Sequence, residues 1–134
     1  MANKIPSILL IDDDIATTTY NEVIIEDSEC VDQVVSKNSG EEALEYLSGV
    51  IGNSQSVPSI IFLDVNMPTM DGWEFLESYL QLDIPNSTPS KIFLLSSSSD
   101  EEEEERMKHN PILEGIKHKP LTIEMIQEIA TNYF

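Results

Sequence analysis

Basic residues are scarce in this sequence. Its 134 residues include 7 lysines and arginines against 25 aspartates and glutamates, which gives a formal net charge of −18 at pH 7. A protein that binds the phosphate backbone of a nucleic acid needs many cationic side chains, so this composition argues against nucleic-acid partners. The charge favours instead protein partners that present a basic surface.

Cysteine and long apolar runs are also scarce. The single cysteine, Cys30, excludes an internal disulfide and a thiolate metal site, and it is compatible with a reducing compartment. No apolar run approaches the roughly 20 residues that a membrane span requires. Lys4 is the only basic residue before the first apolar run, which is too short for the core of a signal peptide. We therefore expect a cytoplasmic protein without a membrane partner.

The length is that of one domain, and we expect residues 1–134 to form a single domain with one core. Short apolar runs bounded by turn residues alternate with helical periodicity, which is typical of buried parallel strands joined by helices. The predicted strands are about Ser7–Ile11, Val31–Ser36, Ile60–Leu63, Lys91–Leu95 and Leu113–His118. The alternation predicts an α/β fold of the (βα)₅ type, a doubly wound parallel sheet with helices on both faces.

Helices are predicted between these strands. One starts at about Asp14, one at the capping box of Ser39 and Glu42, one at Asp71, one lies within Asp100–Lys108, and one starts at Thr122. Residues Ser48–Ser59 and Asp83–Ser90 are predicted to be long loops. Helical spacing predicts that these residues face the core: Ala16, Tyr20, Val23 and Ile24 in the first helix; Ala43, Leu47, Val50 and Ile51 in the second; Trp73, Leu76, Tyr79 and Leu80 in the third; and Ile126, Ile129, Ala130 and Tyr133 in the last.

Polar residues of chemically useful types follow four of the apolar runs. Asp12 and Asp13 follow the first run, Asp64 follows the third, Ser96 follows the fourth and Lys119 follows the last. In an open parallel sheet, ligands bind beyond the carboxyl ends of the strands. We therefore expect three carboxylates, a hydroxyl and an ammonium group to converge at one edge of the sheet.

This set of side chains suits a metal ion and a phosphoryl group. Two carboxylates about 4 Å apart repel by about 4 kcal/mol at an effective dielectric constant of 20, so we expect a cation among them. Ligands that are all oxygens favour Mg²⁺ over zinc, and the carbonyl of Asn66 is a plausible further ligand. Asp64 could attack phosphorus, while Lys119 and Ser96 could contact phosphoryl oxygens.

The chain resembles response-regulator receiver domains of the CheY type. The matching motifs, which span nearly the whole chain, are Leu9-Leu10-Ile11-Asp12-Asp13-Asp14, Asp64-Val65-Asn66-Met67-Pro68, Met70-Asp71-Gly72, Leu95-Ser96-Ser97 and Lys119-Pro120-Leu121. The resemblance implies a flavodoxin-like fold whose five-stranded sheet has the order 2-1-3-4-5. It implies a receiver domain without an output domain.

The resemblance also implies a function in two-component phosphorelay signalling. Asp64 would accept a phosphoryl group from a sensor histidine kinase or a phosphotransfer protein, while Asp12, Asp13, Asp64 and the Asn66 carbonyl would hold Mg²⁺. Ser96 and Lys119 would detect the phosphoryl group. They would change the surface formed by the last strand and its two flanking helices, which would bind a downstream protein target. The chain would be a monomeric signalling protein, not an enzyme: it would catalyse only its own Mg²⁺-dependent phosphorylation and dephosphorylation.

Two local features depart from the family pattern. Family members often carry an aromatic switch residue three positions before the lysine, where this chain has Ile116, so the switch formed by Ser96 and Ile116 depends mainly on Ser96. The acidic run Asp100–Glu105 is expected to form the weakly held, solvated first half of a helix. The alternative for this run is a docking surface for a basic partner.

Three alternatives remain at this point. A phosphatase of the haloacid dehalogenase type would need a threonine where this chain has Ala16. A calcium loop starting at Asp64 would place Pro68 and Phe75 at its fifth and twelfth positions, and the twelfth should be a glutamate. A receiver-like interaction module that is never phosphorylated would not need the aspartates and Lys119, whose presence counts against it.

Overall fold

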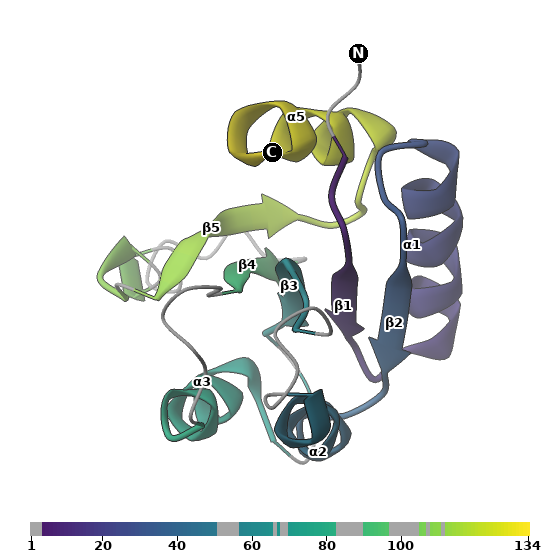
Figure 1. The fold of residues 1–134 in the computed structure, drawn as a ribbon. Coiled ribbons are helices and arrows are strands. Elements are labelled where there is room, and N and C mark those ends of the chain that lie inside the picture. The colour runs from purple at the N-terminus through teal and green to yellow at the C-terminus, as the bar shows by residue number, and fades with distance from the viewer. Residues whose placement is uncertain are drawn as a thin grey trace.

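The five parallel strands form one sheet. The structure is a computed structural model, and it describes residues 4–50, 57–65, 67, 70–82, 90–96, 105–106, 108–110 and 112–134. The strands are β1 (Ile8–Ile11), β2 (Val34–Lys37), β3 (Ile60–Asp64), β4 (Lys91–Ser96) and β5 (Leu113–His118). Their order is β2-β1-β3-β4-β5, and every pair is parallel (Figure 1). The predicted fold class and strand order are confirmed.

Helices cover both faces of the sheet. The described helices that the structure delimits are α1 (Ile15–Asp27), α2 (Gly40–Val50), α3 (Gly72–Leu80) and α5 (Ile123–Tyr133). Figure 1 shows α5 on one side of the sheet and α2 with α3 on the other, and α1 contacts α5. The helix predicted within Asp100–Lys108 lies mostly outside the described residues, although Glu105, Arg106 and Lys108 are helical.

The core consists of one apolar cluster on each face. Alternate strand residues such as Leu9 and Ile11 face α2 and α3, whereas Ile8 and Leu10 face α1 and α5. All four residues of β1 are buried. Burial on both faces explains why the predicted strands are continuous apolar runs and do not alternate with polar residues.

The predicted caps begin their helices. The Asp71 carboxylate accepts a bond of 2.9 Å from the Glu74 amide, and the Glu74 carboxylate accepts one of 3.2 Å from the Asp71 amide, which is a complete capping box. At α2, the Ser39 hydroxyl accepts the Glu42 amide at 3.1 Å. The Glu42 carboxylate accepts the amide of Asn38, one residue before the position that a capping box requires.

The buried side of α1 differs from the prediction. Its buried residues are Thr18, Asn21 and Ile25, while Tyr20 and Val23 are 47% and 49% exposed. Because two small polar residues occupy the inner side, the apolar periodicity indicates the wrong side of the helix. The prediction was therefore wrong for these residues: Ala16, Tyr20 and Val23, with Ile24 half-buried.

Two residues in other helices are more exposed than predicted. In α3, Leu80 is 61% exposed because Phe75, which is fully buried, occupies the inner side. In α5, Tyr133 is 38% exposed, although the edge of its ring contacts Phe93. Ile126, Ile129 and Ala130 are buried as predicted.

Two boundaries also differ from the prediction. The second strand begins at Val34, because Val31 forms only an isolated bridge with Ile5. Helix α2 continues through Ser48 to Val50, so the predicted loop starts too early. Residues 51–56 and 83–89 of the two predicted loops, and with them Ile51, lie outside the described residues. Among the described residues, no helix is long and apolar enough to cross a membrane.

Candidate functional site

Three aspartates converge beyond the carboxyl ends of β1 and β3. These neighbouring strands pair in register up to Ile11 and Leu63, so Asp12 and Asp64 follow at the same level. One carboxylate oxygen from each of Asp12, Asp13 and Asp64 lies within 4.8 Å of the other two. Asp12 and Asp64 are buried and Asp13 is exposed, so the cluster opens to solvent on one side.

Lys119 bridges the two buried carboxylates. Its Nζ lies 3.2 Å from Asp12 Oδ2 and 3.2 Å from Asp64 Oδ1. The backbone positions this lysine, because its amide donates to the Ser96 carbonyl at 2.8 Å as the chain leaves β5. The peptide bond to Pro120 is cis. The structure therefore brings together residues that are 107 positions apart in the chain.

The aspartates keep Lys119 charged. Burial lowers the pKa of the lysine, but the attraction of Asp64 and then of Asp12 outweighs burial, so the pKa is raised above its ordinary value. An ammonium group with a raised pKa is protonated at neutral pH. The site therefore contains a permanent positive charge beside the carboxylate of Asp64.

Asp14, the third aspartate of the run, belongs to the helix and not to the cluster. Its carboxylate caps α1 by accepting the amide of Ala16 and the hydroxyl of Thr17, each at 3.0 Å. The hydrogen bond from the Thr17 side chain, supported by backbone hydrogen bonds, lowers the pKa of Asp14. Its own amide donates to Asp12 Oδ1 at 2.9 Å, so the run makes a tight turn from strand into helix.

The cluster fits a divalent cation. The three carboxylates and the Lys119 ammonium together carry a formal charge of −2, which one divalent cation would balance. All the candidate ligands are oxygens, and Mg²⁺ prefers a few carboxylates and several waters at such a site. Asp12, Asp13 and Asp64 therefore fit Mg²⁺. Asn66, whose carbonyl is a predicted ligand, lies outside the described residues.

The predicted switch residues lie at different depths. Ser96 ends β4, next to β3, and is 1% exposed. Ile116 lies in β5, where it pairs with Leu94 of β4. It is half-buried and packs against the apolar cluster beside α2 and α3. Ser96 therefore lies at the level of the strand ends, while Ile116 lies within the strand beside the core.

Gly72, which the sequence analysis names within a motif but to which it gives no role, brings α3 close to the site. A Cβ atom on Gly72 would lie 3.1 Å from Val65 Cα and 3.2 Å from the Asp64 carbonyl oxygen, closer than most side chains can approach. The Gly72 amide also donates to the Val65 carbonyl at 3.0 Å. The helix therefore starts in direct contact with the backbone that carries Asp64. Glycine directly after the cap Asp71 is the signal in the sequence.

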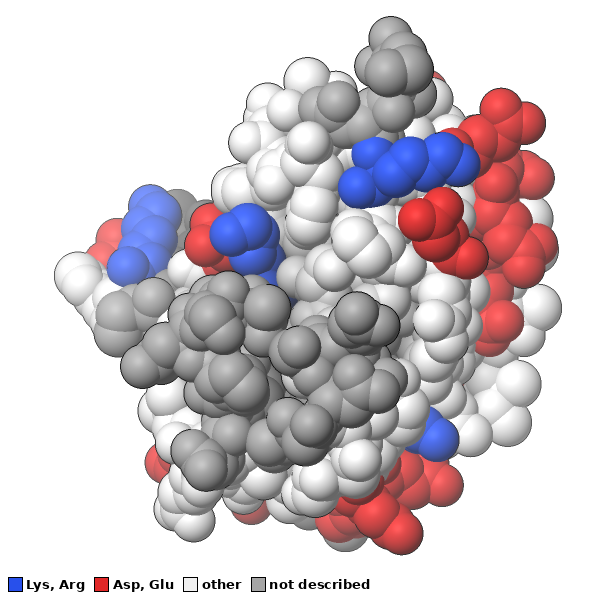
Figure 2. Space-filling view, viewed as in Figure 1, with Lys and Arg blue, Asp and Glu red and all other residues white. Residues whose placement is uncertain are grey.

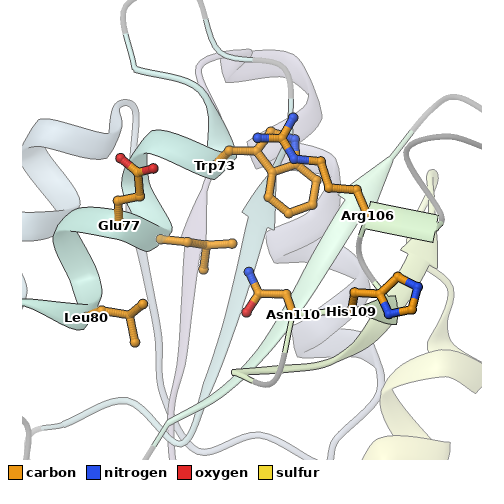
Figure 3. Close-up of a pocket in the computed structure, with 7 residues that line it drawn as sticks. Trp73, Glu77, Leu80, Arg106, His109 and Asn110 are labelled. Atoms are coloured by element: carbon orange, nitrogen blue, oxygen red, sulfur yellow. The ribbon is translucent and has the colours of Figure 1, made fainter.

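A separate hollow lies between α3 and the residues that precede β5 (Figure 3). It has a volume of about 360 Å³, and the Arg106 guanidinium lies over the Trp73 ring at 4.2 Å from its centroid. None of the predicted site residues lines it. Its lining residues are Trp73, Leu76, Glu77, Leu80, Arg106, His109 and Asn110.

Comparisons with known proteins agree with this fold. The family model described as response regulator receiver domain matches residues 8–131. A two component response regulator from Cytophaga hutchinsonii is 32% identical over 96% of this chain and 98% of its own, with a TM-score of 0.86. A response regulator receiver protein from Dyadobacter fermentans is 25% identical over 96% and 97%, with a TM-score of 0.82.

A third solved structure shows the likeness of the fold alone. The chemotaxis protein CheY4 of Vibrio cholerae is 23% identical over 97% of this chain and 99% of its own, with a TM-score of 0.72. A search of curated proteins finds no match.

Proposed function

This chain belongs to the response regulator receiver family, and from this membership we propose that it accepts a phosphoryl group on Asp64 in two-component phosphorelay signalling. The donor would be the phosphohistidine of a sensor kinase or of a phosphotransfer protein. The observation that carries the proposal is the contact of Lys119 Nζ with Asp64 Oδ1, inside a cluster of three carboxylates. A nucleophile, a cation for the phosphoryl oxygens and a set of metal ligands then occupy one edge of the sheet.

The reaction would transfer the phosphoryl group from nitrogen to oxygen. A carboxylate oxygen of Asp64 attacks phosphorus, the P–N bond of the phosphohistidine breaks, and the imidazole leaves with the electron pair and takes up a proton. The product is an acyl phosphate, which water hydrolyses to restore the carboxylate. The ammonium of Lys119 attracts the phosphoryl oxygens as it now attracts Asp64. Bound Mg²⁺ would neutralise charge on the phosphoryl group.

The chain would act as a signalling protein and not as an enzyme on external substrates. We propose that Ser96, buried at the end of β4, meets a phosphoryl oxygen and moves the segment that follows it. That change would shift the population of two surface states around β5 and α5, which a downstream protein target reads. Ile116 occupies the position three residues before Lys119, where family members often carry an aromatic switch residue. We also propose that the chain is a monomer and acts in the cytoplasm.

Incubation with Mg²⁺ and a small acyl-phosphate donor tests this function. We expect one phosphoryl adduct, seen by mass spectrometry of the intact protein, that hydroxylamine removes and that fails to form when a chelator removes Mg²⁺. Absence of an adduct at saturating donor and Mg²⁺ would favour the interaction module that is never phosphorylated. Rapid turnover of an external phosphomonoester would favour the phosphatase.

The exposed side of α1 supports a protein as the phosphoryl donor. The helix follows Asp13 and exposes Ile15 (68%), Tyr20 (47%) and Val23 (49%), apolar or aromatic side chains of the kind that protein interfaces use. Acidic side chains flank this side of the molecule (Figure 2). A donor that reaches Asp64 would pass over these residues. We therefore propose that α1 contributes to docking of the donor protein.

Tyr20→Ala separates docking from chemistry. With a histidine kinase that phosphorylates the unchanged chain, we expect transfer to Tyr20→Ala to slow by about tenfold, because exposed tyrosines often dominate interfaces. Phosphorylation by the small acyl-phosphate donor should not change, since it does not need the docking surface. Leu80→Ala is the control, because Leu80 is also a large exposed side chain (61%) but lies on α3. Equal slowing in both variants, or none, would contradict the assignment of α1.

A further inference from the structure

We propose that Thr18 is a positioning residue that fixes the backbone carrying the metal-binding aspartates. This inference rests on the proposed function, because it concerns the same cluster of carboxylates. Thr18 lies on the inner side of α1 and is 5% exposed. Its hydroxyl contacts backbone carbonyls, so its effect on the cluster would pass through the backbone.

The Thr18 hydroxyl ties the start of α1 to the end of β1. Its Oγ1 lies 3.0 Å from the Asp14 carbonyl oxygen and 3.5 Å from the Asp12 carbonyl oxygen. The bond to Asp14 is short, and the second, longer contact reaches the residue whose carboxylate meets Lys119. A hydroxyl has one proton to donate, so Thr18 bonds mainly to the Asp14 carbonyl and more weakly to the Asp12 carbonyl. These two acceptors lie on either side of Asp13, the exposed member of the cluster.

Two further hydrogen bonds hold the turn on the two sides of Asp13. The Asp12 amide donates to the Lys37 carbonyl at 3.2 Å, which holds the strand side of the turn. The Asp14 amide donates to Asp12 Oδ1 at 2.9 Å, which holds the helix side. Asp13 lies between these points, and the carbonyls on its two sides are the ones that Thr18 contacts. Without the hydroxyl, the turn around Asp13 would be less constrained.

The neighbouring Thr19 provides a comparison within the same helix turn. Its hydroxyl makes the same kind of bond, to the Ile15 carbonyl four residues earlier at 2.9 Å, but its side chain is exposed and the bond stays within the helix. Such bonds are common for threonine in helices. Of these two threonines, only Thr18 also contacts a residue of the carboxylate cluster, the Asp12 carbonyl at 3.5 Å, so the pair separates positioning from helix packing.

Thr18→Val removes the hydroxyl while keeping the branched shape. The Asp14 carbonyl keeps a partner in this variant, because it also accepts the Thr18 backbone amide at 2.9 Å. We therefore expect the helix and the fold to persist. Removing a group that supports metal ligands from behind often weakens metal binding by about tenfold, and we expect a similar loss of Mg²⁺ affinity here.

The experiment is a titration of the unphosphorylated, full-length chain with Mg²⁺ alone, followed by nuclear magnetic resonance. We expect Thr18→Val to raise the Mg²⁺ dissociation constant by about tenfold, while Thr18→Ser, which keeps the hydroxyl, and Thr19→Val stay within about twofold of the unchanged chain. Urea unfolding of each variant measures stability separately. If Thr18→Val is too unstable to titrate, Thr18→Ala takes its place, and its comparison with Thr18→Ser isolates the hydroxyl because both variants lack the methyl group.

Each outcome bears on a different statement. Equal Mg²⁺ affinity of Thr18→Val and the unchanged chain would overturn the role of Thr18 and leave the proposed function intact. Weak binding by Thr18→Ser as well would show that packing of the methyl group matters, and would overturn the positioning role of the hydroxyl. Failure of the unchanged chain to bind Mg²⁺ would overturn the metal assignment and this inference with it.

Discussion

The Asp64→Asn variant will acquire no hydroxylamine-labile adduct from a small acyl-phosphate donor. The substitution keeps the size of a buried side chain at the end of β3 but replaces the carboxylate by an amide, whose oxygen is a far weaker nucleophile. Neither Asp12 nor Asp13 should substitute for it. In this proposal both hold the metal, and Asp12 already accepts hydrogen bonds from Lys119 and the Asp14 amide.

Asp14→Asn is the control for this experiment. Asp14 belongs to the same acidic run, but its carboxylate caps α1 and lies outside the carboxylate cluster. Asparagine caps helices about as well as aspartate, so the fold and the adduct should both be retained. Intact mass spectrometry before and after hydroxylamine measures the result. An adduct on Asp64→Asn at the level of the unchanged chain would mean that another side chain is the phosphoryl acceptor.

The convergence of the site could be predicted because it follows from strand direction. Asp12, Asp64, Ser96 and Lys119 each follow an apolar run, and in a parallel sheet every such run ends at the same edge. This rule holds whatever the details of packing. The rule predicts that Asp12 and Lys119 lie close together although most of the chain separates them, and the structure places their charged groups 3.2 Å apart.

The inner side of α1 could not be predicted by the same kind of reasoning. Helical periodicity locates the core-facing side by its apolar residues, but here the inner side carries Thr18 and Asn21. The Thr18 hydroxyl is satisfied by backbone carbonyls that become available only once α1 follows β1 through the Asp12–Asp14 turn. A contact between a side chain and a backbone carbonyl leaves no periodic signal in the sequence. The prediction therefore assigned Tyr20 to the core, although Tyr20 is exposed and the buried residues of α1 are Thr18, Asn21 and Ile25.

The Lys119→Met variant should lose about 3 kcal/mol of its free energy of unfolding when Mg²⁺ is absent. Methionine keeps the length of the side chain but removes the charge that bridges Asp12 and Asp64. Both carboxylates are buried, and removing one partner of a buried ion pair typically costs about 3–5 kcal/mol. We use the lower end because 20% of the Lys119 side chain is exposed. Urea unfolding in the presence of a chelator measures the loss.

Lys117→Met is the matched control for this variant. Lys117 lies two residues earlier, and its Nζ is 5.8 Å from the centroid of the Phe93 ring, where it meets no carboxylate of the cluster. Such a contact contributes about 0.5–1 kcal/mol at an exposed position and more when desolvated, and Lys117 is half-buried, so we expect the control to lose about 1 kcal/mol, well below the loss of Lys119→Met. Equal losses in the two variants would mean that the ion pair of Lys119 adds nothing to stability.

Mg²⁺ and pH should each change the effect of Lys119→Met in a defined direction. A divalent cation at 100 times its dissociation constant stabilises any chain that binds it by about 2.7 kcal/mol, the unchanged chain included. Lys119→Met lacks the ammonium that repels the cation, so we expect it to bind Mg²⁺ more tightly and the difference in stability between the two chains to shrink when Mg²⁺ is added. The folded state raises the pKa of Lys119, so its stabilisation is complete below the ordinary value of 10.5 and is lost as the pH rises through the raised value. The difference in stability between the unchanged chain and Lys119→Met should therefore be constant near neutrality and should shrink only above about pH 10.5. A difference that already shrinks at neutral pH would contradict a lysine held charged by the two aspartates.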